Sequence, residues 1–85
     1  MSATPEDFER AVAESKQLTN RPDNATLLRM YALFKQASHG DERGERPGAT
    51  DFVGRAKFDA WAALDGVSQE QARADYIELI ESLKD

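Results

Sequence analysis

The chain has 85 residues and a mass of 9.5 kDa, so we expect a single domain over residues 1–85 with one hydrophobic core. With 40% hydrophobic and 32% charged residues it resembles neither a disordered tail nor a membrane-spanning segment, and the lack of cysteine excludes disulfides, thiol nucleophiles and thiolate metal sites. The net charge of −5 disfavours binding to nucleic acid and to anionic membrane surfaces.

The first predicted helix begins after Thr4 and is expected to end near Leu18. Thr4 supplies a hydroxyl N-cap, Pro5 suits the first helical position, and two carboxylates follow where the helix dipole favours them. Pro22 prevents the helix from continuing. Apolar and small residues recur at spacings of three and four, at Phe8, Ala11, Val12, Ser15 and Leu18.

A second helix is expected from a cap at Asp23 or Asn24 to Ser38 or His39, where Gly40 ends it. It carries two adjacent stripes, so more than half of its circumference is apolar. The first stripe contains Leu27, Met30, Phe34 and Ala37, and the second contains Leu28, Tyr31, Lys35 and Ser38.

Residues 40–53 show no sustained periodicity and predict a loop, which is long for a compact domain. The third helix should begin within residues 51–54, stop at Gly66, and bury some of Phe58, Trp61, Ala62 and Leu64. Ser68 should cap the fourth helix, with the Gln71 side chain reaching back to the Ser68 amide. Its inner face is expected to comprise Ala72, Tyr76, Ile77, Leu79, Ile80 and Leu83.

Four helices and no strand candidate predict an all-α four-helix bundle. The short links before the second and fourth helices favour antiparallel neighbours. The long loop can run back far enough to start the third helix parallel to the second. An up-down-down-up order is therefore allowed.

One stripe of the second helix places Tyr31 and Lys35 one turn apart, following Leu28. An apolar contact, an aromatic ring with a hydroxyl and a cation would suit a ligand with an apolar end, a base and a phosphate. The alternative interpretation is that Tyr31 packs in the core while Lys35 extends to water.

A second basic group, Arg55 and Lys57, lies near the start of the third helix. Positive side chains oppose the helix dipole there, so their presence hints at a bound anion. The middle third of the chain, residues 29–58, carries six basic and four acidic residues, a surplus that agrees with an anionic ligand but is small enough to arise by chance.

The run from Ser38 to Asp41 contains a serine, a histidine and a carboxylate, which invites a catalytic interpretation. Adjacent residues at a helix end do not face one another as a nucleophile, a base and an orienting acid must. A histidine in the last turn is better explained by its favourable interaction with the helix dipole. One histidine and scattered carboxylates also lack the spacing of a zinc or calcium site, so we expect no metal.

Several spaced motifs are together more specific than any one of them. In these motifs the sequence resembles the acyl-CoA-binding proteins, and the match spans essentially the whole chain. The motifs are Tyr31 with residues 34–37, Gly40-Asp41, residues 45–48 with Asp51-Phe52, residues 56–61, Gly66 with Ser68, and residues 74–77.

The resemblance implies the up-down-down-up fold and a ligand rather than a cofactor, a long-chain fatty acyl-CoA. The adenine would lie against Tyr31, and the ribose 3'-phosphate would be held by Lys35 and Lys57. Positions matching Lys16 and Tyr76 would surround the coenzyme head group.

The acyl chain would lie in a groove bordered by the second and third helices, where Leu27 and Leu28 match the apolar lining of the family. The resemblance further implies a monomeric carrier that binds acyl-CoA with high affinity, maintains an acyl-CoA pool and catalyses no reaction. The N-terminal residues 1–7 lack the features of a signal peptide, and we expect a cytoplasmic location.

Three positions depart from the family pattern. Phe34, which we include in the binding site, stands where many members have a tyrosine, and Phe58 replaces a frequent tryptophan. Val53 falls where a lysine is frequent, although Arg55 retains a nearby cation. We expect weaker recognition of the head group rather than loss of binding.

Two other functions remain as alternatives. One is a thioesterase that hydrolyses the same ligand, although no activated nucleophile is evident. The other is a helical adaptor whose groove on the second helix accepts an amphipathic helix of another protein.

Overall fold

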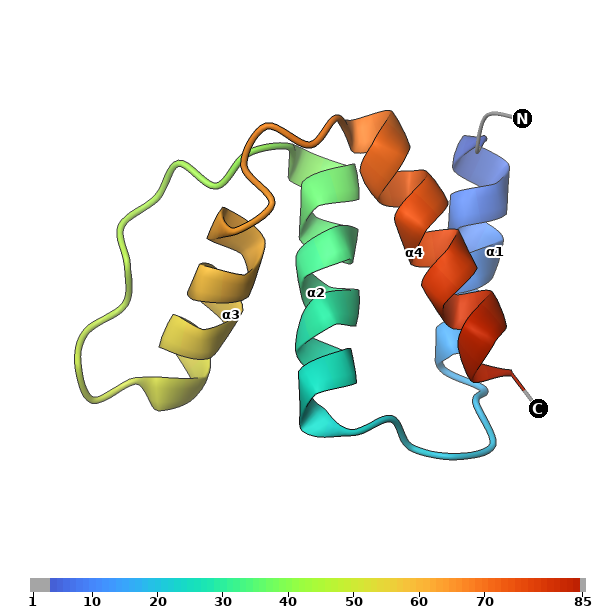
Figure 1. Ribbon diagram of the computed structural model, residues 1–85, viewed down its shortest axis with the longest axis horizontal. Coiled ribbons are helices and arrows are strands. Elements are labelled where there is room, and N and C mark those ends of the chain that lie inside the picture. Colours follow the sequence, from blue (N-terminus) through green and yellow to red (C-terminus); the bar gives the residue numbers. More distant parts are fainter. Residues whose placement is uncertain (1–3, 85) are drawn as a thin grey trace.

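The computed structural model describes residues 4–84, which contain the helices α1 (Pro5–Ser15), α2 (Asn24–His39), α3 (Phe52–Ala62) and α4 (Gln69–Leu83). α2 lies between α3 and α4, and α1 packs on the outer side of α4 (Figure 1). α1 and α4 run in one direction, and α2 and α3 run in the other. The predicted all-α, up-down-down-up fold is therefore confirmed.

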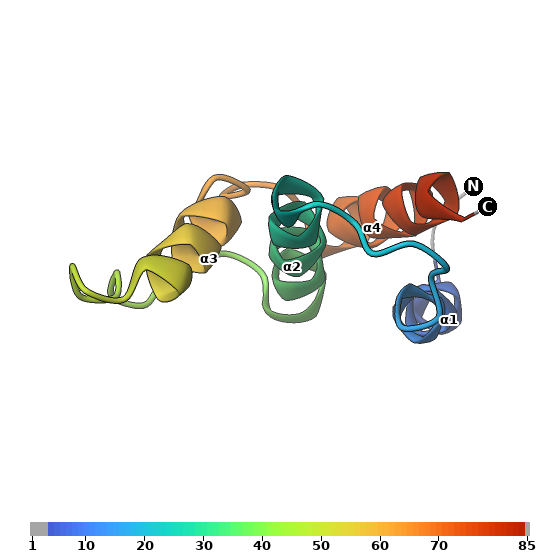
Figure 2. The ribbon, with the colours of Figure 1, turned by 90° about the horizontal axis from the view of Figure 1, so that it is seen from below.

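The helices form a flattened row rather than a square bundle. The Cα atoms extend over 37 × 28 × 15 Å, and Figure 2 shows α3, α2 and α4 side by side with α1 to one side of their layer. Helix packing involves α2 with α4, α2 with α3, and α1 with α4. Because α3 and α4 lie on opposite sides of α2, α2 is the element that joins the two halves of the domain.

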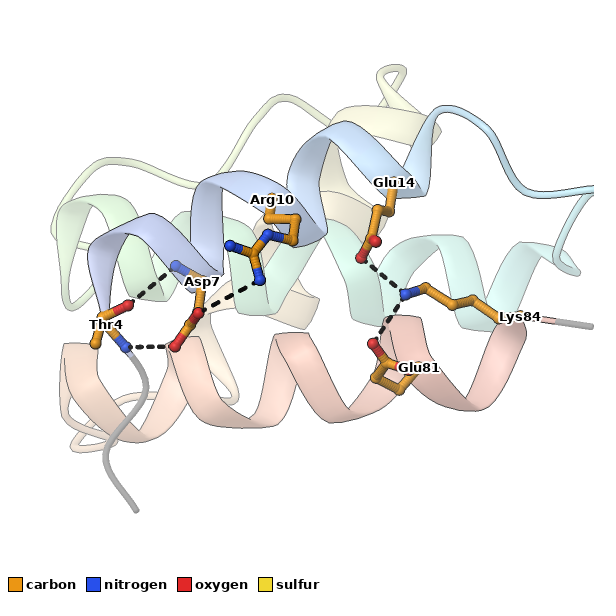
Figure 3. Close-up of polar contacts among 6 residues, drawn as sticks. All are labelled: Thr4, Asp7, Arg10, Glu14, Glu81 and Lys84. Atoms are coloured by element: carbon orange, nitrogen blue, oxygen red, sulfur yellow. Dashed lines mark hydrogen bonds and ion pairs between the residues drawn. The ribbon is translucent and has the colours of Figure 1, made fainter.

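The N-terminus of α1 is capped from both sides. Oγ1 of Thr4 accepts a hydrogen bond from the Asp7 amide over 3.1 Å, and the Asp7 carboxylate accepts one from the Thr4 amide over 3.4 Å (Figure 3). This reciprocal pair satisfies two backbone donors that would otherwise lack a partner. The predicted start of the first helix is confirmed.

α1 ends at Ser15, three residues before the predicted end at Leu18. The Ser15 hydroxyl donates to the Val12 carbonyl over 2.6 Å, which is the oxygen that the Lys16 amide would use to continue the helix. The Lys16 amide bonds instead to the Ala13 carbonyl over 3.2 Å, which tightens the last turn. The connection to α2 is therefore longer than expected. The backbone of α1 lies alongside α4, and α1 reaches α2 through the ring of Phe8, which stacks on Phe34.

A lysine joins the C-terminal ends of α1 and α4. Nζ of Lys84 lies 2.9 Å from Glu14 Oε1 on α1 and 2.8 Å from Glu81 Oε1 on α4 (Figure 3). These two carboxylates, acting first through their hydrogen bonds, raise the pKa of Lys84. The contact helps to fix α1 alongside α4.

The bounds of α2 agree with the prediction. Oδ1 of Asp23 accepts a hydrogen bond from the Thr26 amide over 2.8 Å. The Thr26 side chain first, and this amide second, lower the pKa of Asp23 through their hydrogen bonds. At the other end, Gly40 has φ +80° and its amide bonds to the Gln36 carbonyl over 2.9 Å. The positive φ explains why a glycine ends this helix.

α3 ends at Ala62, whereas the sequence placed its end at Gly66. The intervening residues continue as tight turns, as when the Leu64 amide bonds to the Trp61 carbonyl over 2.9 Å. Gly66, with φ +89°, reverses the chain toward α4.

The predicted capping box of α4 is half right. Oγ of Ser68 accepts a hydrogen bond from the Gln71 amide over 3.0 Å. The Gln71 side chain does not reach back to Ser68, because its Nε2 donates to Asp75 Oδ1 over 2.8 Å. A capping box needs Oε1 of Gln71 to accept from the Ser68 amide. The charge-assisted hydrogen bond from Nε2 to a carboxylate one turn ahead holds the side chain away from that position.

The core lies where α1, α2 and α4 meet. The ring of Tyr76 packs edge-on against Phe8 at a centroid distance of 5.2 Å, and Phe34 stacks on Phe8 at 6.0 Å. Each fully buried apolar side chain contributes about 1.5 to 3 kcal/mol. The buried members of this cluster are Ala11, Leu33, Tyr76 and Ile80.

The predicted core residues of the third helix are only partly buried. No residue of α3 is fully buried, because this helix packs against α2 alone. Phe58, Trp61, Ala62 and Leu64 each retain some exposed surface.

The long connection between α2 and α3 curves around the outer side of α3 (Figure 1), and two arginines join it to that helix. Arg46 donates two hydrogen bonds to the Asp59 carboxylate, over 3.0 and 2.8 Å. Nε of Arg55 donates to the carbonyls of Pro47 and Gly48, over 2.9 and 3.1 Å. Arg55 thus has a structural partner near the helix start, so its position there requires no bound anion.

Candidate functional site

An apolar groove of about 450 Å³ lies between α2 and α3. The side chains on α2 recur at helical spacing, and those on α3 come from its first two turns. Apolar and aromatic groups dominate, with two cations at the rim, which is the composition of a ligand pocket. The lining residues are Arg21, Asn24, Leu27, Leu28, Tyr31, Phe52, Val53, Ala56 and Lys57.

Two large apolar side chains that line the groove are exposed to solvent to an unusual degree. Phe52 is 79% exposed and Val53 is 65% exposed at the start of α3. Two adjacent apolar residues that border an apolar groove mark a site for another molecule more strongly than isolated surface residues do.

Two lysines from different helices converge on the ring of Tyr31. Nζ of Lys57, on α3, lies 5.3 Å from the ring centroid, and Nζ of Lys35, on α2, lies 5.8 Å from it. Both distances are within the range of cation–π attraction. The arrangement combines one flat aromatic surface with two positive charges, which suits an aromatic ligand that carries an anionic group.

Lys35 also contacts Trp61, whose Nε1 is held by two acceptors. Nζ of Lys35 lies 5.5 Å from the indole, and Nε1 donates to Gln36 Oε1 over 3.0 Å and to the Gly40 carbonyl over 2.9 Å. Gln36 is completely buried, and its Nε2 donates to Asp41 Oδ1 over 2.8 Å. A buried polar network therefore lies directly behind the cationic end of the site.

Five of the residues proposed from the sequence come together. Leu27, Leu28, Tyr31 and Lys57 line the groove, and Lys35 lies beside Tyr31 one turn further along α2. Tyr31 is half-buried with its ring facing both lysines, which answers the question whether it belongs wholly to the core.

The other three proposed residues lie elsewhere. Phe34 and Tyr76 belong to the aromatic cluster of the core, where their centroids are 6.4 Å apart. Lys16 is exposed at the C-terminus of α1. None of the three lines the groove.

Sequence reasoning missed several groove residues and the role of the tryptophan. Phe52 and Val53 lie one turn before Ala56 and Lys57, so helical spacing from Lys57 could have identified them. The helical spacing of Trp61 from Phe58 predicts a core residue, and nothing in that spacing indicates that the indole nitrogen bonds to Gln36.

The catalytic interpretation of residues 38–41 does not fit the geometry. His39 lies against the Trp61 ring at 6.0 Å, while the Asp41 carboxylate bonds to Gln36 and, over 3.0 Å, to the Gly66 amide. Among residues 4–84, no three histidine, cysteine or acidic side chains come together to form a metal site. None of the helices in this range has both the length and the apolar character that a membrane crossing requires.

Two smaller depressions are lined mainly by polar side chains. One, of about 290 Å³, lies at α2 and α4 and includes Arg29, Asp75 and Glu78. The other, of about 310 Å³, includes Glu14 and Lys84. Neither combines an aromatic face with convergent cations, so the α2–α3 groove is the stronger candidate site.

Comparisons with known proteins identify the same family that the motifs indicate. The family model described as "Acyl CoA binding protein" matches residues 5–80. The acyl-CoA-binding protein homolog of Manduca sexta is 47% identical over 79 residues, which cover 92% of this chain and 88% of that protein. The crystal structure of acyl-CoA-binding protein 2 from Oryza sativa matches with a TM-score of 0.88 and 40% identity, covering 92% of this chain and 87% of that chain.

A match to a larger protein shows that this domain also occurs as part of longer chains. Enoyl-CoA delta isomerase 2 of Rattus norvegicus is 47% identical over 83 residues, which cover 98% of this chain. The chain spans only 21% of the length of that enzyme. With a family match over most of its length and relatives of similar size, the chain belongs to the acyl-CoA-binding protein family.

Proposed function

We propose that this domain binds long-chain fatty acyl-CoA esters and acts as an intracellular acyl-CoA carrier and pool former. The observation that carries the proposal is the convergence of Lys35 and Lys57 on the Tyr31 ring at one end of an apolar groove. Family membership supports the same ligand class.

In this proposal the adenine stacks on Tyr31 and the 3'-phosphate lies between Lys35 and Lys57. Charge-assisted hydrogen bonds from two ammonium groups suit a dianionic phosphate. The acyl chain follows the groove past Leu27 and Leu28, where it removes apolar side chains from water. Phe52 and Val53, exposed at the mouth, then gain an apolar neighbour.

The remaining proposed contacts are peripheral to the groove. Lys16 is exposed and free to move toward an anionic head group. The Tyr76 ring is buried, but its hydroxyl makes no hydrogen bond to another residue within 4–84, so it retains the capacity to bond a ligand. Phe34 offers only its ring edge, because it lacks the hydroxyl that many family members have there.

The two halves of the ligand contribute in different ways. Withdrawing a palmitoyl chain from water is worth up to roughly 12 kcal/mol, at about 0.8 kcal/mol per methylene, and association consumes several of these. Phosphate contacts supply the rest, so nanomolar affinity, about −12 kcal/mol, is attainable for the intact ester. Free coenzyme A and free fatty acid should each bind far more weakly.

We propose a binding domain rather than a thioesterase. His39 faces the Trp61 ring, and no hydrogen bond among the described residues links it to a serine. A hydrolase would need such a base beside its nucleophile. We also propose a cytoplasmic location, with which the lack of cysteine agrees. We further propose that the domain works as a monomer and without a cofactor.

Isothermal titration with palmitoyl-CoA, coenzyme A and palmitate tests this proposal. We expect tight one-to-one binding of palmitoyl-CoA and much weaker binding of the two fragments. Comparable affinity for palmitate and palmitoyl-CoA would contradict the two-part site. Following free thiol during incubation with palmitoyl-CoA separates binding from hydrolysis, and thiol release at a catalytic rate would favour the thioesterase.

A further inference from the structure

The Lys35 ammonium lies between two aromatic rings that come from different helices. Its Nζ is 5.8 Å from the Tyr31 centroid and 5.5 Å from the Trp61 ring. Tyr31 lines the groove, whereas Trp61 does not. A lysine on a flexible stem samples many positions, and attraction to two ring faces restricts it. Trp61 therefore acts on Lys35 from outside the groove.

The Trp61 ring is itself held in one orientation. Its single donor, Nε1, is shared between Gln36 Oε1 at 3.0 Å and the Gly40 carbonyl at 2.9 Å. An indole whose N–H lies between two fixed acceptors cannot rotate without losing both bonds. The face that it turns toward Lys35 is thus determined by the residues around its nitrogen.

The first of these acceptors, Oε1 of Gln36, is held in place because both polar atoms of the Gln36 side-chain amide are hydrogen-bonded. It is 0% exposed, and its Nε2 donates to Asp41 Oδ1 over 2.8 Å and to the Val67 carbonyl over 2.7 Å. Asp41 also accepts from the Gly66 amide over 3.0 Å. The network joins the end of α2, the start of the long loop and the segment before α4, so it is rigid.

We propose that Trp61, held by Gln36 and Gly40, is a positioning residue that presents the Lys35 ammonium to the 3'-phosphate of the ligand. This inference rests on the function proposed above and adds the means by which that site distinguishes a phosphorylated ribose. A positioned ammonium loses less freedom on binding, so the interaction with the phosphate is stronger. Trp61 therefore determines specificity without touching the apolar tail.

The test compares palmitoyl-CoA with its 3'-dephospho analogue by isothermal titration. The ratio of their dissociation constants measures the preference for the phosphate. In Trp61→Leu we expect this ratio to fall about two- to fivefold, the range for loss of one cation–π contact at a partly exposed site. Trp61→Phe keeps a ring but loses both N–H bonds, so we expect a smaller fall.

Two further variants separate positioning from folding. Lys35→Ala should lower the same ratio, and adding Trp61→Leu to it should lower the ratio no further, because the tryptophan acts through the lysine. Gln69→Ala is the matched control. It removes a hydrogen bond of 3.2 Å to the Ala37 carbonyl at the same end of α2 and should leave the ratio unchanged.

A measurement on the ligand-free protein tests the geometry directly. The ε-methylene protons of Lys35 lie beside two rings, so their NMR shifts should differ from those of a free lysine. In Trp61→Leu they should move toward the free value. If circular dichroism shows that Trp61→Leu does not fold, both the NMR measurement and the titration are made on Trp61→Phe.

The outcomes distinguish the inference from the function on which it rests. An equal loss of affinity for both esters in the Trp61 variants would make Trp61 merely structural and overturn the inference. If the ratio fell in Lys35→Ala but not in the Trp61 variants, the inference would also be overturned, while the proposed function would stand. Failure of the unmodified domain to bind either ester would overturn the proposed function itself.

Discussion

Oδ1 of Asp41 accepts a hydrogen bond from Nε2 of the completely buried Gln36 over 2.8 Å. The same oxygen accepts from the Gly66 amide over 3.0 Å. The Gln36 bond is the main cause, and the Gly66 bond the second, of a pKa for Asp41 below its ordinary value. The charged carboxylate thus joins the end of α2 to the segment before α4.

The first prediction concerns acid stability. Because the folded pKa of Asp41 is lowered, the unfolded chain binds the proton more readily, and the stabilisation is fully present above the unfolded pKa of about 4. It is lost as the pH falls through the folded pKa. We expect the free energy of unfolding to decline below about pH 4, and Asp41→Asn to make this decline less steep.

Urea unfolding at a series of pH values, in both proteins, measures the difference. Asp23 and Asp59 also have lowered pKa values, through their bonds to Thr26 and Arg46, and contribute equally to both curves. Parallel curves for the variant and the unmodified protein would show that Asp41 does not contribute to the pH dependence.

The second prediction concerns the reversal before α4. Gly66 has φ +89°, a conformation that costs an ordinary L-residue about 1 to 2 kcal/mol. Gly66→Ala should lower the free energy of unfolding by that amount. Gly48→Ala is the matched control, since no atom lies within 4 Å of the added methyl group and its φ is not positive. We expect a change between about 0 and +1 kcal/mol there, and equal losses at both glycines would contradict the backbone argument.

The sequence predicts the end of a helix correctly only where a capping residue within the same turn sets that end. α2 begins and ends as predicted because Asp23 and Gly40 act within their own turns. α1 ends early because the Ser15 hydroxyl takes the Val12 carbonyl, a rotamer choice that apolar spacing does not reveal. The Gln71 side chain likewise bonds to Asp75 and not to the Ser68 amide, which the capping-box pattern does not reveal.

The part of the site that lies on α2 alone could be predicted from the sequence. Tyr31 and Lys35 share a stripe, so their proximity follows from spacing alone. The approach of Lys57 to Tyr31 depends on how α3 packs against α2, and only the family resemblance, which assigns Lys57 and Lys35 to the same phosphate, places the two helices at one site. The indole bond from Trp61 to Gln36 depends on the same packing and had no signal in the sequence.

The third prediction concerns the two lysines. Lys35→Ala and Lys57→Ala should each weaken palmitoyl-CoA binding by about 1.5 to 3 kcal/mol, because each removes one charge-assisted contact to the phosphate. The double variant should lose less than the sum, since both cations share one anion. Titration with the 3'-dephospho analogue is the control, and the single variants should change its affinity little. Loss of helicity by circular dichroism in either variant would indicate a structural role instead.

The fourth prediction separates the two properties of Tyr76. Its ring is 3% exposed and packs against Phe8, so Tyr76→Leu should lower the free energy of unfolding by at least about 1.5 kcal/mol. Tyr76→Phe retains the ring and should leave stability nearly unchanged. If the hydroxyl bonds the head group as proposed, this variant weakens palmitoyl-CoA binding by about 0.5 to 1.5 kcal/mol. An unchanged dissociation constant would confine Tyr76 to the core.

The fifth prediction concerns the groove itself. Leu28 lies on the α2 side of the groove and is only partly buried, so Leu28→Ala leaves little cavity in the protein. The variant withdraws apolar contact from the acyl chain, which should weaken palmitoyl-CoA binding by about 1 kcal/mol. Affinity for coenzyme A should not change, because the head group does not reach this side chain in the proposed arrangement.

A series of acyl-CoA esters of increasing length makes this test sharper. The gain in affinity per added methylene should be the same in both proteins for chains too short to reach Leu28 and smaller in Leu28→Ala for chains that pass it. Met30→Ala is a control of similar size on the core side of the same helix, where Met30 packs against the buried cluster. It should lower stability by about 1 kcal/mol or more, because it removes contacts to the core, without altering the dependence on chain length. A uniform loss for every ligand in Leu28→Ala, coenzyme A included, would mean that the acyl chain does not follow the α2–α3 groove.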